Sequence, residues 1–385
     1  MNRRKHYDFA IIGLGTMGSF AAVELAQRGF SVVGFDQFVP PHERGSHSGG
    51  TRVYRIAYPE GTGYVQLAQR AGELWDQAAL QFSTQLLHRV GMLYMGLPHE
   101  EFIQGIQASA TANRLQLETL DATEVYRRYP AFNIPEDFVG IFDAKAGWID
   151  VDASITSAHS HAKALGVEYM LGHRVETWEA SDSQVRVHLR NETISAGKLI
   201  ITAGSWTTKL LSDLRLPLTV RRKVLTWFDP LVPELFAADG FPVFTFPENS
   251  IYGFPNIPGV GVKLAEHLGG TDLSSIDSAV SPPDASDIDP IRETASKYMP
   301  GLAGAFPGSA ARLVRSATCL YTMTPDENFI VDRHPQFNSV VFAAGFSGHG
   351  FKFAPLIGAA LADLAQEGRT GLPIDFLALN RFARC

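Results

Sequence analysis

Several features of other protein classes are missing from this chain of 385 residues. Its two cysteines, Cys319 and Cys385, are too few for a disulfide framework, and no close Cys/His grouping indicates a zinc site. No apolar run approaches the roughly 18 residues that a membrane span needs. We therefore expect a protein of the reducing cytoplasm that holds no metal ion and does not enter a membrane.

The chain also lacks an excess of positive charge, internal repeats and low-complexity tracts. Its formal net charge of −7 argues against nucleic acid or an anionic membrane as the main partner. The basic start, Arg3-Arg4-Lys5, is followed at once by Asp8 and by a short, glycine-broken apolar stretch, so it does not read as a secretory signal. With 45% hydrophobic residues the chain can bury a large core, and its length favours two domains.

The N-terminus, by contrast, carries a complete dinucleotide-binding pattern. A short apolar run leads into Gly13-Leu14-Gly15-Thr16-Met17-Gly18, an amphipathic helix pattern follows to Arg28, and a second apolar run ends in Asp36. The glycine spacing alone is weak, because the chain has 35 glycines. The strand before it, the helix after it and the acid beyond the second run are the context that the motif needs physically.

Each residue type in this pattern has a physical reason. Gly13 permits a tight turn, Gly15 lets the backbone approach a pyrophosphate, and Gly18 lets helix and strand pack closely. The free N–H groups at the helix start would bind the phosphates. Asp36 would accept hydrogen bonds from the adenosine ribose. The sequence therefore predicts an ADP-binding fold.

Two further strand–glycine–helix junctions occur, near residues 202 and 345. They predict an α/β (α+β) fold in which a Rossmann-like binding domain is discontinuous and interleaved with a second, mainly antiparallel β domain that holds the substrate. We assign residues 1–90, 150–215 and 316–385 to the first domain, and 91–149 and 216–315 to the second. An ADP site at one end of the chain and a glycine-rich junction at the other favour an extended cofactor, FAD, over a nicotinamide.

Apolar periodicity predicts the helices, and turn residues predict the loops. Helices are expected over residues 64–87, 101–114, 152–165, 289–299 and 354–366, with another from 206 to 214, and turns at 247–249 and 258–259. The long stretch 40–52, rich in Pro, His, Gly and Ser, is expected to lie against a ligand.

Four blocks make the chain similar to the family of monomeric sarcosine oxidase and N-methyltryptophan oxidase, over nearly its whole length. They are the N-terminal motif; Gly45-Ser46-His47 with Thr51-Arg52 and Arg55; Tyr252-Gly253-Phe254-Pro255 with Lys263 and His267; and Cys319-Leu320-Tyr321 through Asp326-Glu327-Asn328-Phe329-Ile330 to Gly345-Phe346-Ser347-Gly348-His349-Gly350-Phe351-Lys352.

The resemblance implies a role for residues that composition alone would leave as ordinary. A lone cysteine is most often a small buried hydrophobe, but here Cys319 is implied to form a thioether to the 8α-methyl group of FAD. A lysine in an apolar strand usually points to solvent, but Lys263 is implied to lie over the flavin, where its charge would favour reduction of O2 to peroxide. The resemblance places His267 at the amine end of the substrate and Arg52 on the other side of the ring. Cys385 is expected to be inert.

Arg55 and Lys352 are implied to bind the substrate carboxylate, through a planar fork and a point charge respectively. Tyr252 and Tyr321 would line the same pocket. The other residues expected at the cofactor are Gly13, Gly15, Thr16, Met17, Gly18, Asp36, His42, Ser46, Thr51, Arg52, Val175, Gly348, His349, Gly350 and Lys352.

Together these features predict an FAD-dependent oxidase of an N-methyl amino acid such as sarcosine or N-methyltryptophan, producing an imine, then formaldehyde and the amino acid, with hydrogen peroxide from O2. We expect a monomer. The alternatives are the same chemistry on fructosyl amino acids or pipecolate-type imino acids, a flavin dehydrogenase that reduces a carrier, and a non-catalytic dinucleotide-binding protein. Ser48, Gly50 and Glu266 depart from the family pattern and put the substrate in doubt.

Overall fold

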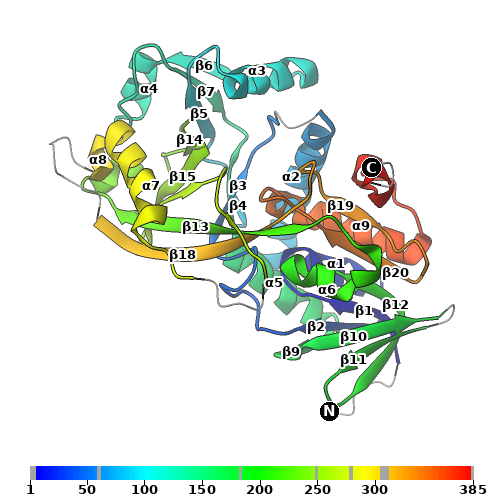
Figure 1. Ribbon diagram of the computed structural model, residues 1–385. Helices are drawn as coiled ribbons and strands as arrows, with labels where there is room; N and C mark the ends of the chain where they lie inside the picture. The colour runs from blue at the N-terminus through cyan, green and yellow to red at the C-terminus, as the bar shows by residue number, and fades with distance from the viewer. Residues whose placement is uncertain are drawn as a thin grey trace.

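The computed structural model describes residues 6–58, 62–181, 184–247, 250–276, 281–303 and 312–382. Among these residues, a mainly parallel sheet and a mainly antiparallel sheet dominate, and a small sheet joins β3 (Thr51–Tyr54), β8 (Gly147–Asp150) and β4 (Leu87–His88) (Figure 1). This arrangement confirms the predicted mixed α/β class. Within the same ranges, no helix combines the length and the apolar character that crossing a membrane requires.

The first sheet is built around β1 (His6–Ile12). Its other strands are β2 (Val32–Asp36), β9 (Glu168–Leu171), β10 (Val175–Ala180), β11 (Val185–Leu189), β12 (Thr193–Ile201), β19 (Ile330–Arg333) and β20 (Val340–Ala344). β1 pairs in parallel with β2 on one side and β12 on the other, while β20 extends the parallel part beyond β12. The carboxyl ends of β1, β2 and β12 therefore meet at one edge, where α/β sheets bind ligands.

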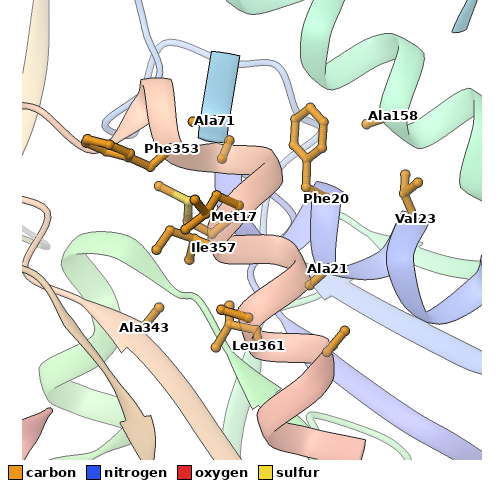
Figure 2. Packing of buried hydrophobic residues seen from close by; sticks show 14 of the residues in the cluster. Met17, Phe20, Ala21, Val23, Ala71, Ala158, Ala343, Phe353, Ile357 and Leu361 are labelled. Atoms are coloured by element: carbon orange, nitrogen blue, oxygen red, sulfur yellow. The ribbon is translucent and has the colours of Figure 1, made fainter. Parts of the chain in front are cut away.

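Alternate residues of β1 separate two hydrophobic layers. Phe9 and Ile11 pack into the cluster formed with the helices, whereas Ala10 and Ile12 pack into the cluster on the opposite face. The helices of the first cluster are α1 (Thr16–Gln27), α2 (Thr62–Phe82), α5 (Val151–Ala164) and α9 (Ala354–Glu367). Figure 2 shows Met17 of α1 beside Ile357 of α9.

The second sheet is antiparallel apart from one pair. In spatial order it contains β17 (Thr271–Asp272), β13 (Thr219–Asp229), β16 (Gly261–Glu266), β15 (Ile251–Ile257), β14 (Val243–Thr245), β5 (Met92–Gly96), β7 (Val139–Asp143) and β6 (Glu118–Asp121), with β18 (Arg312–Met323) alongside β13. The parallel pair is β14 with β5. The accompanying helices are α3 (Glu101–Asn113), α4 (Ala122–Arg128), α7 (Ala285–Tyr298) and α8 (Pro300–Ala303).

The strand pair β13 and β18 runs through the middle of the molecule (Figure 1). The predicted domain boundary at residue 316 falls inside β18, whose whole length pairs with β13 of the antiparallel sheet. Strand pairing thus does not follow that boundary, and the division of the chain into two domains stays a prediction.

Several predicted helix ends are wrong. The helix predicted over 64–87 ends at Phe82, because Ser83 adopts a left-handed φ of 52° and the N–H of Thr84 returns to the carbonyl of Ala79. The helix predicted over 206–214 is limited to α6 (Thr207–Leu210) between two 3-10 turns. The β-branched Thr207 and Thr208 disfavour a longer helix there.

Capping explains two further differences. α7 begins at Ala285 rather than 289, because Asp284 and Asp287 form a capping box. α4 was not predicted at all, although Asp121 caps it by accepting a hydrogen bond from the Glu124 N–H. The turn at 258–259 is confirmed, with Gly259 at a φ of 78°. Residues 248 and 249 of the other predicted turn, and Cys385, lie outside the described residues.

The contact between α1 and α9 provides a test of the packing. A side chain at Gly358 would place its Cβ 2.7 Å from the backbone carbonyl carbon of Phe20 and 2.8 Å from the amide nitrogen of Ala21. Because backbone cannot yield as a side-chain tip can, we expect Gly358→Val to lower the free energy of unfolding by about 1–3 kcal/mol or more. Urea unfolding measures this. Gly371→Ala is the control, since no atom lies within 4 Å of the Cβ it adds, and an equal loss in both variants would contradict the packing argument.

Candidate functional site

A cavity opens where β1, β2 and β12 end, and it extends to the long strand β18. The segments that line it come from distant parts of the chain. The predicted site residues on its wall are Gly13, Gly15, Thr16, Met17, Asp36, His42, Ser46, Arg52, Val175, Tyr321, Gly348 and Gly350. The structure thus brings most of the residues expected at the cofactor to one elongated space.

The glycine motif forms a tight cradle at one end of this cavity. A Cβ at Gly13 would lie 2.4 Å from the Thr202 carbonyl oxygen, and one at Gly18 would lie 1.9 Å from the Gly13 oxygen. These two glycines are therefore required by contact between backbone segments. Gly15 is the N-cap of α1, and no side chain of the described residues caps the helix there. Its first N–H groups remain for a ligand, as phosphate binding at a helix N-terminus requires.

Asp36 stands at the end of β2, beside the cradle. Its two carboxylate oxygens accept hydrogen bonds from the N–H groups of Leu14 and Phe38, both at 2.9 Å. These bonds fix the carboxylate and leave further lone pairs for ribose hydroxyls. Burial raises the pKa of Asp36 and lowers the pKa of His42; it lowers the pKa of His47 to about 3. His47, whose ring lies against Gly15, is therefore a neutral neighbour of the phosphate end.

These observations fit FAD. The uncapped helix start and the glycine cradle suit the pyrophosphate, and Asp36 suits the ribose. The cavity also reaches Tyr321, Gly348 and Gly350, which lie more than 300 residues beyond the glycine motif in the sequence.

Cys319 lies on β18 next to the loop that leads into β3. Its thiol is buried, with Sγ 3.5 Å from Nη2 of Arg52 and 3.6 Å from the carbonyl oxygen of Ser46. The Arg52 guanidinium also donates to the carbonyl oxygens of Ser46 and Thr51, both at 2.7 Å. The structure therefore brings together Cys319, Arg52, Ser46 and Thr51, which the sequence had placed at the cofactor.

Lys263 is a buried cation on β16. Its Nζ donates to the Gly49 carbonyl at 2.8 Å and to the carbonyl and hydroxyl oxygens of Thr51, each at 3.1 Å. Burial, followed by the charge of Arg52, lowers its pKa. The three accepting oxygens match the three protons of an ammonium group, so the geometry favours the charged form.

Three rings gather on the same side of the antiparallel sheet. His267 lies 5.9 Å from Tyr321 and 6.4 Å from Tyr252, measured between ring centroids. A hydrogen bond joins the two tyrosine side chains, and burial raises the pKa of both. The Tyr321 ring also lies against Gly348, in the segment that leads to Lys352. The predicted pocket residues are thus neighbours.

Arg55 and Lys352 meet around Tyr58, a residue that the sequence analysis missed. Lys352 Nζ donates to the Tyr58 hydroxyl and to the His349 carbonyl, both at 2.7 Å. The Arg55 guanidinium carbon lies 4.1 Å from the centroid of the Tyr58 ring. His349 Nδ1 is 3.2 Å from the same hydroxyl. The position of Tyr58, three residues beyond Arg55 at the end of that block, was the available signal.

The departures from the family pattern also have defined places. Ser48 donates to the Thr318 carbonyl at 2.8 Å, which ties the loop to the residue before Cys319. A Cβ at Gly50 would lie 4.0 Å from a carboxylate oxygen of Asp152. Glu266 lies 3.8 Å from Nζ of Lys223, a second residue that the sequence analysis missed. Among the described residues, no group of three His, Cys, Asp or Glu side chains could hold a metal ion.

Comparison with known sequences finds relatives that match nearly the whole chain. The chain is 36% identical to monomeric sarcosine oxidase of Bacillus sp. (strain B-0618) over 385 residues, which cover 98% of this chain and 96% of that protein. It is 34% identical to N-methyl-L-tryptophan oxidase of Yersinia pestis (strain Pestoides F) over 384 residues, which cover 98% and 99% of the two chains.

Solved structures show the same fold. The open form of NikD, described as an unusual amino acid oxidase essential for nikkomycin biosynthesis, has a TM-score of 0.85 and 25% identity over 97% of this chain and 98% of that one. L-proline dehydrogenase from P. horikoshii has a TM-score of 0.86 at 20% identity, covering 99% of both chains. The family model for FAD dependent oxidoreductases (DAO) matches residues 8–364, and the chain belongs to that family.

Proposed function

We propose that this chain is an FAD-dependent oxidase of secondary amino acids, with N-methyl amino acids such as sarcosine or N-methyltryptophan as its substrates. The observation that carries the proposal is the pair of buried cations, Arg55 and Lys352, which both contact Tyr58. The segment that leads to Lys352 also contacts Tyr321 at Gly348, and Tyr321 lies beside His267 and Tyr252. The relatives named for oxidation of sarcosine and N-methyltryptophan support it.

The reaction balances with one water and one O2 for each substrate. FAD, when bound, supplies the acceptor for two electrons from the amine and delivers them to O2. The substrate loses a hydride equivalent from carbon and a proton from nitrogen, water hydrolyses the resulting imine, and the products are the primary amino acid, formaldehyde and hydrogen peroxide.

The protein's own residues bind and orient the amino acid. Arg55 and Lys352 would hold the carboxylate through charge-assisted hydrogen bonds of roughly 1.5–3 kcal/mol each. His267 would accept the proton of the substrate ammonium, aided by desolvation, since burial favours the neutral amine. The buried ring of Tyr321 and the half-buried ring of Tyr252 would orient the N-substituent and exclude water.

We further propose that Cys319 holds FAD as a thioether and that Lys263 supplies the charge for oxygen reduction. Their burial beside Arg52 and Thr51 supports both assignments. The same proposal includes four further predictions: the cofactor residues named from the sequence, the two-domain division, a monomeric state and a cytoplasmic location. The word "monomeric" in the names of the relatives and the low cysteine content support the last two.

A substrate panel tests the function directly. We expect hydrogen peroxide release, and anaerobic bleaching of the flavin, with sarcosine or N-methyltryptophan. We expect neither with N-methylpropylamine, because it lacks the carboxylate that Arg55 and Lys352 would bind. Fructosyl-glycine and pipecolate complete the panel. Faster turnover of either would replace the substrate class, and bleaching without peroxide would indicate a dehydrogenase.

The Cys319 linkage has its own measurement. In Cys319→Ser, acid precipitation should release the flavin into the supernatant, whereas the wild-type pellet should stay yellow and fluoresce on a denaturing gel. Serine lacks the nucleophilic thiolate that a thioether needs. Cys385→Ser is the matched control and should retain the flavin. Pigment that stays fastened in Cys319→Ser would exclude this attachment site.

Replacing Lys263 should slow flavin reoxidation by O2 more than flavin reduction by the substrate. In Lys263→Met, stopped-flow reoxidation of the reduced enzyme by O2 should slow by roughly 100-fold or more, because a fixed cation no longer stabilises the negative charge that develops on oxygen. Anaerobic reduction by substrate should change far less. Lys163→Met, at an exposed position on α5, is the control. Equal slowing of both half-reactions would remove the proposed role.

A further inference from the structure

Lys223 is a buried cation on the sheet face that carries Cys319. It lies on β13, directly opposite Cys319 in the antiparallel register with β18. Directly opposite residues project to the same face of a sheet. Only 2% of the Lys223 surface is exposed, and its Nζ lies 5.8 Å from the centroid of the Tyr321 ring. The ammonium group of Lys223 therefore lies beside Tyr321, one of the residues proposed to line the substrate pocket.

The contacts of Lys223 fall on both sides of His267. Its Nζ donates to the carbonyl oxygen of Leu268, at 2.5 Å, and lies 3.8 Å from the carboxylate of Glu266. These residues immediately precede and follow His267. The Lys223 side chain, on the neighbouring strand, thus binds the backbone of Leu268 after the histidine and faces the carboxylate of Glu266 before it.

The His267 N–H donates to the Ser250 carbonyl at 3.1 Å, and the turn that follows gains a further contact from Lys223. β16 ends at Glu266, and the chain then turns through Gly269 and Gly270, which have φ values of 70° and 92°. Glycines restrict the backbone least of all residues, so they do not fix the turn by themselves. Leu268 is 56% exposed and contributes little burial to hold it. A Cβ at Gly270 would lie 2.8 Å from Cδ of Lys223, which shows how closely the turn wraps this side chain.

We propose that Lys223 is a positioning residue of the reaction: by binding the residues on both sides of His267, it fixes that imidazole against Tyr252 and Tyr321 at the amine end of the substrate. The role of His267 in this statement rests on the proposed function. The clamp itself, from Lys223 to the 266–270 turn, does not.

The charge of Lys223 makes the clamp sensitive to pH. Burial lowers its pKa to about 8, while the carboxylate of Glu266 opposes that shift. The other charged or titratable groups around it are Arg221 on the same strand, Tyr321 on β18 and His267 on the turn. Cys319 also lies opposite it, but its thiol would not titrate once bound to FAD. The ammonium is present below pH 8 and is lost as the pH rises through about 8, so its attraction to Glu266 weakens there.

Hydrogen exchange tests the clamp without relying on turnover. In the FAD-loaded Lys223→Met enzyme at pH 7, the amides of residues 266–270 should exchange about 10-fold faster or more than in wild type, measured by mass spectrometry. Lys223→Arg should restore slow exchange, because it keeps a cation, and Glu266→Gln should give a smaller increase. Lys198→Met is the matched control, since Lys198 also bonds backbone carbonyls, those of Ala365 and Gln366. It should leave the turn unchanged.

Kinetics then connects the clamp to the reaction. Anaerobic flavin reduction by sarcosine should slow about 10- to 100-fold in Lys223→Met, as expected for a displaced catalytic group, with O2 reoxidation within about twofold of wild type. Lys223→Arg should recover the rate and move the alkaline fall in the rate of flavin reduction from near pH 8 to higher pH.

Unchanged exchange at 266–270 in Lys223→Met, or the same increase in Lys198→Met, would overturn the clamp. If the turn loosens and flavin reduction does not slow, the positioning role is overturned. A wild-type enzyme that no secondary amino acid reduces would instead overturn the proposed function and leave the exchange result standing.

Discussion

The antiparallel pairing of β13 with β18 is the constraint on which the rest of the site depends. Its register places Lys223 opposite Cys319 and Arg221 opposite Tyr321. A slip of one residue would turn every one of these side chains to the other face of the sheet. The pairing of β13 with β16 then sets Lys263 opposite Trp227 in the same sheet. The positions of these side chains at the site therefore depend on strand register as much as on residue identity.

The cations of this region, all buried except the half-buried Arg52, share one kind of partner. Arg52, Lys223, Lys263 and Lys352 each donate to backbone carbonyl oxygens, and Arg55 donates to the carbonyl of Ala57. A carbonyl dipole satisfies a buried N–H group without cancelling a full charge. Lys223 also faces the Glu266 carboxylate at 3.8 Å. The positive charge of the other four is thus kept available for an anionic ligand, at the expense of concentrating like charges in a largely buried space.

The sequence predicted the parts of this protein that local chemistry determines. The glycine motif, the strand that ends at Asp36 and the helix near the C-terminus depend on neighbours in the chain, and the structure has them. The end of α2 at Ser83 and the short α6 depend on single backbone conformations that apolar periodicity does not report. Tyr58 and Lys223 were missed for another reason. Their importance comes from partners on other elements, Lys352 and the turn after β16, and one sequence gives no register between strands.

The segments that line the cavity are synthesised at different times, so the cavity can form only after the last of them. β1 is synthesised before its neighbour β12 and before the segments at Tyr321 and Gly348, which follow only in the second half of the sequence. Contacts between residues so far apart in sequence form late, because the loop between them must close first. A nascent polypeptide thus carries a nucleotide cradle with one side missing, and cofactor capture belongs to the finished chain rather than to its early folding.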